Sequence, residues 1–381
     1  MNIEREWCWY QMCSVGDVGP ATINKLMEYA GGLEEALEMT TDEVRESHIC
    51  SAKMLAGWNK AKLEKRRIRE EFEHLESRGM RFVSIEHEDY PGKLRDLKDA
   101  PFGIWVKGRL PVECKPCASI IGSRGCTSHG LELARDIGKK LAGIGVQVVS
   151  GMALGIDAAG QWGALDAGGY SLGVLGSGVD VCYPRDNIDL YETLTQSGGL
   201  LSEKAPGTPG LPAFFRLRNR LISGLSDCVI VVEAREKSGT QITVSCALDQ
   251  GREVFCVPGR MTDPLSCGCN QMISQGARIL YDFSELADFF DAETECFTND
   301  AKTVELSELE GMVYARLTDE PKHFEEVLNE TCLPVGELME ILLRLEMKGV
   351  VYQQVKNYYR KCLSIQILRQ FPVAKTRCVS V

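Results

Sequence analysis

Three short loops contain the residue types that bind phosphate groups. Each loop follows an apolar run and precedes a segment with helical spacing, so the free N–H groups that begin a helix lie beside it. The loops are Gly122-Ser123-Arg124, residues 150–157 with Gly151 and Gly155, and Ser238-Gly239-Thr240. Glycine allows close approach to the backbone, and the arginine fork suits a pair of phosphate oxygens. Together the loops predict a ligand that carries phosphate. Asp157 either belongs to this site or caps the next helix.

The segment 212–226 indicates which kind of phosphate ligand to expect. We predict a helix that starts after Pro212 and carries two aromatic rings beside a cationic track: Phe214, Phe215, Arg216, Arg218, Asn219 and Arg220. Arg216 and Arg220 are one helical turn apart and share a face. Cations beside aromatic rings hold single strands, because every nucleotide has a phosphate and every base has a flat face. The alternative is a solvated charged helix whose aromatic residues lie in the core.

The bulk composition is that of an ordinary globular protein. Of 381 residues, 44% are hydrophobic and 25% are charged, and the net charge is −11. No run reaches the roughly 20 apolar residues of a membrane helix, and the charged first residues do not form a signal peptide. We therefore expect a cytoplasmic protein with no membrane partner. The acidic total leaves room for local basic patches such as segment 216–220 and the tail beyond Glu346, which holds no acidic residue.

The 16 cysteines are scattered along the chain. Several lie inside apolar runs, where a reduced cysteine acts as a small hydrophobic residue. The close pairs are Cys114 with Cys117 and Cys267 with Cys269, and a structural zinc site needs four ligands in a tetrahedron. We expect reduced thiols, no metal and no cofactor, with a zinc site as the alternative.

Residues 79–292 alternate between apolar, β-rich runs and amphipathic segments, which predicts the scaffold that positions the loops. The runs lie at 118–122, 146–150, 171–176, 200–203, 227–233 and 253–257. Near-continuous apolar runs are typical of strands buried on both faces of a parallel sheet, and their alternation with helices predicts a doubly wound fold. The predicted class is therefore α/β, with a Rossmann-like, mostly parallel sheet at the core.

Two smaller regions flank this core. Residues 1–78 are predicted to be short helices joined by glycine turns, as in a helix-hairpin-helix or SAM-like domain, which either docks a protein or contacts DNA backbone. Residues 303–360 are predicted to form three helices and a short β wing, a winged helix that is interpreted as a docking unit or as a DNA reader. Leu338, Ile341, Leu342 and Leu345 form one apolar helix face there. Residues 361–381 form a basic tail.

The ordered motifs between about residues 85 and 285 resemble the DNA-processing protein A (DprA/Smf) family. They are Gly122-Ser-Arg, Ser150-Gly-x-Ala-x-Gly-Ile-Asp157, Gly178-Val-Asp-x-x-Tyr-Pro184, Arg218-Asn-Arg220, Glu233-Ala with Ser238-Gly-Thr240, and Val257-Pro-Gly259. The resemblance implies a homodimer, formed through the Rossmann-like core, that binds single-stranded DNA and helps to load the RecA recombinase onto it without catalytic turnover. It assigns the Gly-Ser-Arg loop and the Arg-Asn-Arg helix to the DNA groove.

The chain also departs from the family pattern. Phe215 is followed by Arg216 where the family commonly has proline, and Pro212 stands near the place of a lysine that some members use to grip phosphate. Both departures concern residues near the expected DNA groove, so they bear on the affinity for single-stranded DNA.

Two enzyme classes and a scaffold are the rival interpretations. Nucleotide phosphoribohydrolases share this core, but their Gly-Thr loop ends in a catalytic glutamate where this chain has Thr243. A dinucleotide-dependent oxidoreductase requires Gly-x-Gly-x-x-Gly, which the first loop lacks. The third alternative is an interaction scaffold without DNA binding, against which the retained arginines argue.

Overall fold

The chain divides into two compact units, Met1–Ala292 and Glu293–Val381. The computed structural model describes residues 3–16, 18–292, 306–318 and 320–361. Most of the predicted basic tail, 361–381, lies outside these residues. Among the residues described, no helix combines the length and the apolar character that crossing a bilayer requires.

The first unit is built on a nine-stranded sheet with the order β1-β2-β6-β5-β4-β3-β7-β8-β9. The strands are β1 (Met80–Ser84), β2 (Gly103–Gly108), β3 (Cys117–Ile121), β4 (Gln147–Ser150), β5 (Ser171–Leu175), β6 (Gly199–Ser202), β7 (Cys228–Val231), β8 (Glu253–Cys256) and β9 (Arg278–Ile279). Strands β3 to β9 run parallel, whereas β2 pairs antiparallel with both β1 and β6. The predicted α/β class with a mostly parallel sheet is confirmed.

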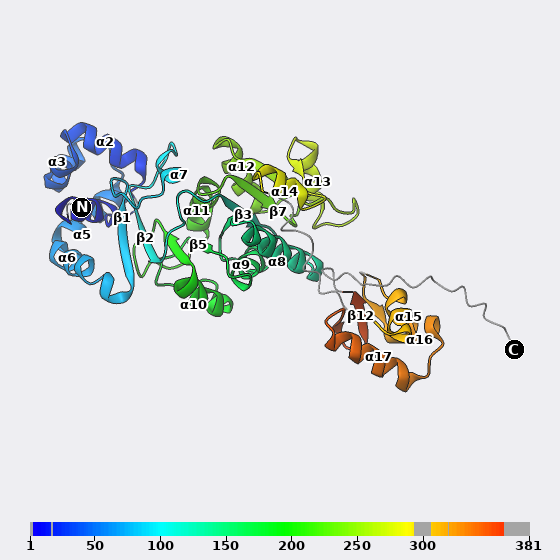
Figure 1. The fold of residues 1–381 in the computed structure, drawn as a ribbon. Helices are drawn as coiled ribbons and strands as arrows, with labels where there is room; N and C mark the ends of the chain where they lie inside the picture. Colours follow the sequence, from blue (N-terminus) through cyan, green and yellow to red (C-terminus); the bar gives the residue numbers. More distant parts are fainter. Residues whose placement is uncertain (1–2, 17, 293–305, 319, 362–381) are drawn as a thin grey trace. The chain divides into compact units, whose positions relative to one another are not determined.

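Helices cover both faces of this sheet (Figure 1). Alternate residues of each strand point to opposite faces, so Cys117 and Ile121 pack in a different cluster from Ala118 and Ile120. The first cluster includes residues of α7 (Gly92–Arg95), α11 (Pro212–Gly224), α12 (Thr240–Asp249) and α13 (Cys267–Ser274). The other face packs against α8 (Ser128–Gly143), α9 (Ile156–Asp166), α10 (Ile188–Ser197) and α14 (Ser284–Phe289). Burial on both faces explains why the strands are mostly apolar.

The N-terminal helices share a core with the antiparallel edge of the sheet. They are α1 (Ile3–Cys13), α2 (Pro20–Ala30), α3 (Leu33–Glu38), α4 (Thr41–Glu46), α5 (Ala52–Leu63) and α6 (Lys65–Glu73), and they lie beside β1 and β2 in Figure 1. Phe82 of β1 and Trp105 of β2 belong to the same cluster as Trp9, Leu26 and Trp58 from these helices. The separate domain over residues 1–78 stays a prediction.

The second unit has the elements of a winged helix. They are α15 (Glu308–Arg316), β10 (Lys322–His323), α16 (Phe324–Thr331), α17 (Val335–Met347), β11 (Val351–Val355) and β12 (Tyr358–Lys361). The strands form a small antiparallel sheet in the order β10-β12-β11. Leu338, Ile341, Leu342 and Leu345 form the buried face of α17, as their spacing predicts.

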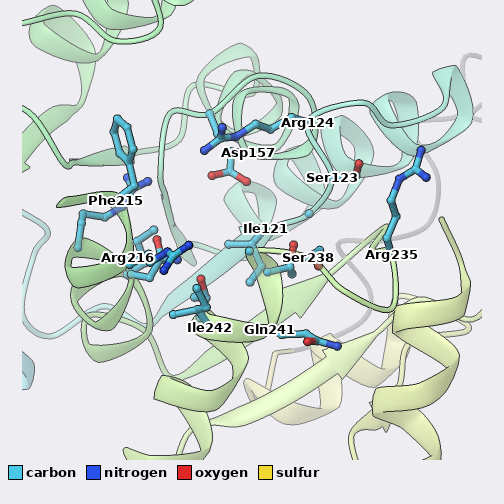
Figure 2. Close-up of a pocket in the computed structure, with 18 of the residues that line it drawn as sticks. Ile121, Ser123, Arg124, Asp157, Phe215, Arg216, Arg235, Ser238, Gln241 and Ile242 are labelled. Carbon is cyan, nitrogen blue, oxygen red and sulfur yellow. The ribbon is translucent and has the colours of Figure 1, made fainter. Parts of the chain in front are cut away.

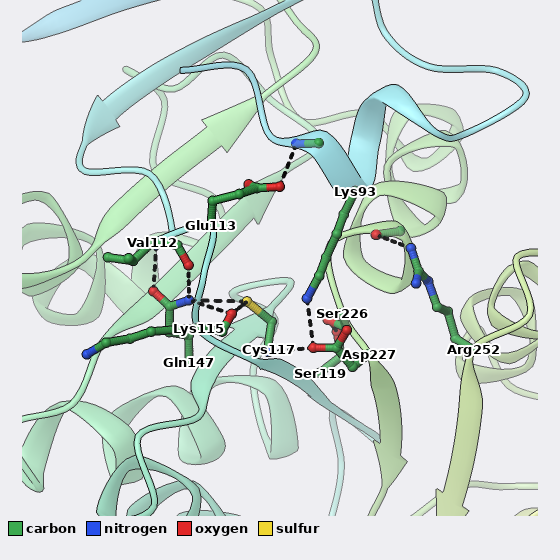
Figure 3. A network of polar contacts seen from close by, with 12 residues as sticks. Lys93, Val112, Glu113, Lys115, Cys117, Ser119, Gln147, Ser226, Asp227 and Arg252 are labelled. Carbon is green, nitrogen blue, oxygen red and sulfur yellow. Dashed lines mark hydrogen bonds and ion pairs between the residues drawn. The ribbon is translucent and has the colours of Figure 1, made fainter. Parts of the chain in front are cut away.

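A polar network fixes the start of the parallel strands (Figure 3). Asp227, just before β7, accepts hydrogen bonds from Lys93 Nζ at 2.7 Å and from the backbone N–H of Cys117 at 2.9 Å. Gln147 accepts from the N–H of Val112 at 2.8 Å and donates to its carbonyl at 3.0 Å. The network ties α7 and the linker before β3 to the sheet.

We expect Asp227→Ala to lower the free energy of unfolding by about 1–3 kcal/mol, because the N–H of Cys117 loses its acceptor. Urea denaturation followed by tryptophan fluorescence measures this loss in the first unit alone, since all five tryptophans lie before residue 293. The matched control is Arg135→Ala, which breaks the exposed pair with Asp166 and should cost less than about 1 kcal/mol. Equal losses in the two variants would show that the network carries no special role.

Candidate nucleic-acid interface

The predicted loops meet at the point where the winding of the sheet reverses direction. Neighbouring strands β3 and β7 continue to opposite sides of the sheet, β3 toward β4 and β7 toward β8. Ligands of doubly wound sheets bind outside the carboxyl ends of such strands. A cavity of about 680 Å³ lies there, lined by residues of the loops after β3 and β7 and of α11. We call it the switch-point cavity (Figure 2).

The loop after β3 is held by Glu233, which lies two residues beyond the end of β7. The N–H of Ser123 donates to the carbonyl oxygen of Glu233 at 2.7 Å, and the N–H of Thr127 donates to its carboxylate at 2.8 Å. A Cβ on Gly122 would come within 2.9 Å of the Glu233 carbonyl oxygen, so only glycine fits there. Gly122, Ser123 and Arg124 all line the cavity, and Arg124 is exposed. The predicted Gly-Ser-Arg loop is therefore placed at the cavity by backbone contacts.

The loop after β4 reaches the cavity lining through Ala153, but its two glycines lie behind that lining. Neither Gly151 nor Gly155 lines the cavity. Gly155 has a φ of +82°, and a Cβ there would lie 2.4 Å from the carbonyl oxygen of Ser123. Asp157 lies in the first turn of α9 and accepts the N–H of Gly151 at 3.2 Å, so it is not the residue that caps the helix. These glycines serve packing within the protein, and their predicted DNA contact stays a prediction.

Helix α11 begins with Pro212 in its first turn, as predicted. Its arginines, however, do not all point into the cavity. Arg216 is exposed and lines the cavity. Arg218 is buried, and its Nη1 donates to the carbonyl oxygens of Gly151 and Val174. Burial lowers the pKa of the Arg218 guanidinium to about 10, opposed by the nearby Asp157. Burial also raises the pKa of Asp157, which the charge of Arg218 opposes.

Arg220, predicted to share a face with Arg216, does not line the cavity. Its side chain is only 11% exposed and pairs with Glu203 at 2.7 Å and with Asp99 at 3.0 Å. Asn219 does line the cavity. The Arg-Asn-Arg motif therefore anchors α11 with two arginines and presents Asn219 between them.

The two phenylalanines of α11 also separate. Phe215 lines the cavity and stacks on Tyr183, with ring centroids 5.0 Å apart and planes 25° apart. Phe214 lies outside the cavity lining and has the ammonium of Lys204 4.9 Å from its ring centroid. One predicted aromatic residue thus faces the cavity, joined by Tyr183.

The loop after β7 adds two cations that the sequence interpretation missed. Arg235 and Lys237 are exposed and line the cavity beside Ser238, Gly239 and Thr240, where α12 begins. Both lie between two quoted motif segments, Glu233-Ala and Ser238-Gly-Thr240, and loop cations have no periodicity that would single them out. Figure 2 shows Arg235 and Arg124 on loops, and Phe215 and Arg216 on α11, around the same space.

The cavity is strongly cationic. Its lining holds Arg124, Arg216, Arg218, Arg235 and Lys237 and one carboxylate, Asp157. Within the described part of the chain, no ion pair involves Arg124, Arg216, Arg235 or Lys237. Nor do the described ranges contain three or more His, Cys, Asp or Glu side chains grouped to hold a metal ion. Unneutralised cations around a recess attract an anionic ligand.

Comparison with known protein families shows to which family the chain belongs. The family model described as DNA recombination-mediator protein A matches residues 81–291, and that of the DprA winged helix domain matches residues 298–355. The chain belongs to the DprA/Smf family. The resemblance inferred from the motifs is thereby confirmed, and so is the winged helix.

Individual DprA/Smf proteins match over most of their length. DNA processing protein DprA of Streptococcus pneumoniae is 34% identical over 68% of this chain and 89% of its own. Protein Smf of Escherichia coli is 34% identical over 75% of this chain and 79% of its own. The solved structure of the Streptococcus pneumoniae protein covers 76% of this chain and 99% of its own, with 30% identity and a TM-score of 0.65.

A second solved structure concerns DNA processing protein A from Helicobacter pylori, which is described as having a unique single-stranded DNA binding mode. It is 26% identical, covers 56% of this chain and 97% of its own, and gives a TM-score of 0.51.

We expect Arg218→Ala to lower the free energy of unfolding by about 3–5 kcal/mol, because Asp157 would lose its compensating charge in a buried site. Arg216→Ala, two residues away on the same helix but exposed, should change it by less than about 0.5 kcal/mol. Urea denaturation with tryptophan fluorescence compares the two. A stable Arg218→Ala variant would mean that this arginine does not anchor α11.

Proposed function

We propose that this DprA/Smf chain binds single-stranded DNA in the switch-point cavity without reading its sequence. The observation that carries the proposal is the set of four exposed cations, Arg124, Arg216, Arg235 and Lys237, around a recess that also holds the stacked rings of Phe215 and Tyr183. Phosphates suit the cations and unpaired bases suit the rings. The single-stranded DNA binding described for the Helicobacter pylori protein supports the same function.

The geometry favours an unpaired strand over a duplex. Phe215 lies within the cavity lining, so a base reaches its ring only when the base has left the helical stack. Helix α11, which borders the site, packs on the sheet through Leu221 and Ile222 and is therefore not free to enter a groove of duplex DNA. Contacts to phosphates and ring faces carry no base sequence.

We also propose that the chain has no catalytic turnover. Asp157, the one carboxylate in the lining, is buried and accepts the N–H of Gly151. The carboxylate of Glu233 accepts the N–H of Thr127. Thr243 lies buried in the lining where a phosphoribohydrolase would carry glutamate. A general acid or base must reach its substrate, and these groups are committed to the fold.

Loading of the RecA recombinase and a homodimer formed through the Rossmann-like core complete the proposal. Both rest on membership of a family described as recombination mediators. A non-specific single-strand binder without turnover acts by presenting the strand to another protein, which agrees with that description.

We expect Arg124→Ala and Arg216→Ala each to weaken binding of a labelled oligothymidylate by about tenfold. Each should also reduce the slope of log affinity against log salt by about 0.7 for every lost phosphate contact. Fluorescence anisotropy at several salt concentrations measures both quantities. Lys139→Ala, which removes an exposed cation near the far end of α8, is the control and should bind as the parent does. Parent-like affinity in both arginine variants, or equal competition by duplex DNA, would overturn the assignment.

We expect the chain to shorten the lag before RecA hydrolyses ATP on oligonucleotides precoated with single-strand-binding protein. The Arg216→Ala variant should shorten this lag less, because the chain must bind the strand before it can load RecA. Measuring at DNA-saturating concentrations separates capture from loading. An unchanged lag under saturation would remove the recombinase from the proposal and leave strand binding in place.

A further inference from the structure

Helix α17 of the winged-helix unit exposes a continuous apolar row. Its members follow one another at i, i+4 spacing and are 54%, 59%, 58% and 81% exposed: Val335, Met339, Leu343 and Met347. The opposite face of the helix already fills the core of the unit. The row therefore contributes little to the fold, and side chains of this size are costly to leave in water.

The charges of α17 exclude DNA as the occupant of this row. The helix carries Glu337, Glu340 and Glu346 and a single arginine, Arg344, whose Nη2 lies 2.5 Å from Glu340 Oε1. A helix in the major groove lies between two phosphate backbones, and the exposed carboxylates of Glu337 and Glu340 would be repelled there. The partner that covers this row must therefore pack against apolar side chains and tolerate acidic residues beside them.

A second copy of the same face meets both conditions. Two α17 helices related by a two-fold axis near residues 341 and 342 run antiparallel, which places Met339 of each copy against Leu343 of the other. The neighbouring i, i+4 row contains Glu340 and Arg344. The same axis places Glu340 of each copy against Arg344 of the other. Rows of i±4 side chains interlock in the commonest class of helix packing, with a crossing angle of about −50°.

We propose that α17 is a self-association surface through which two copies of this chain contact each other in an antiparallel, two-fold arrangement. The apolar row has the same i, i+4 spacing in both copies, and the adjacent row is self-complementary in charge. Methionines suit such a contact because their flexible side chains adapt to the opposing surface. The surface shares no residue with the switch-point cavity, so the proposal stands independently of DNA binding.

The size of this surface determines how strongly two copies are expected to associate. Four exposed side chains from each copy make a small interface, so the association should be weak and dependent on concentration. In a protein that also dimerises through its core, this contact would join dimers to one another.

The test uses the full chain with the photo-crosslinking residue p-benzoylphenylalanine in place of Met339. Equal amounts of unlabelled and ¹⁵N-labelled protein are mixed and irradiated, and cross-linked peptides are identified by mass spectrometry. We expect pairs that join one light and one heavy chain within residues 335–347. Cross-links that instead reach the segment 362–381 or residues 1–292, or the absence of light–heavy pairs within 335–347, would overturn the proposal.

Charge variants in the same background test the two-fold geometry. Arg344→Glu should lower the yield of light–heavy cross-links by about fivefold, because symmetry removes two pairs at once. The double variant Glu340→Arg with Arg344→Glu should restore it, because the swapped row is again self-complementary. Leu309→Lys, at an exposed apolar position on α15, should leave the yield unchanged. Circular dichroism checks that each variant keeps its helices. Failure of the double variant to restore the yield would reject the antiparallel arrangement.

Discussion

The position of α11 over the sheet depends on one buried charge. Arg218 reaches the carbonyl oxygens of Gly151, after β4, and of Val174, in β5, and it lies near Asp157 in α9. A guanidinium out of water requires these partners, so the helix has little freedom to rotate or slide. Arg216, two residues earlier, is thereby turned toward the cavity. The anchoring of one arginine thus makes another available to a ligand.

Much of the fold follows from the sequence because its causes are local or repetitive. The runs at 118–122 and 227–233 are mostly apolar and contain most of β3 and β7, since strands buried on both faces have no side that faces water. Pro212 marked the start of α11, because a proline in the first turn leaves no N–H unpaired. The three loops came together because the carboxyl ends of parallel strands share one edge.

The different roles of the arginines and glycines in the site could not be predicted, because each role depends on residues that are distant in the sequence. Spacing placed Arg216 and Arg220 on one helix face, but Glu203 and Asp99 hold Arg220, and neither is near it in the sequence. Gly155 was interpreted as exposing backbone to phosphate, whereas its positive φ and the nearby carbonyl oxygen of Ser123 show a packing role. Arg235 was missed because a loop residue acquires its direction only from the complete fold.

The net charge of −11 and a cationic cavity are compatible because the charges are separated in the chain. The cations of the cavity lie on loops and on α11, where the single carboxylate of the lining is buried. The winged-helix unit instead exposes Glu337 and Glu340 on the helix that would enter DNA in a reader of this fold. An acidic α17 would repel the ligand that the cavity attracts. The exposed carboxylates of α17 therefore suit contact with protein better than contact with DNA, whereas in the first unit four exposed cations surround the switch-point cavity.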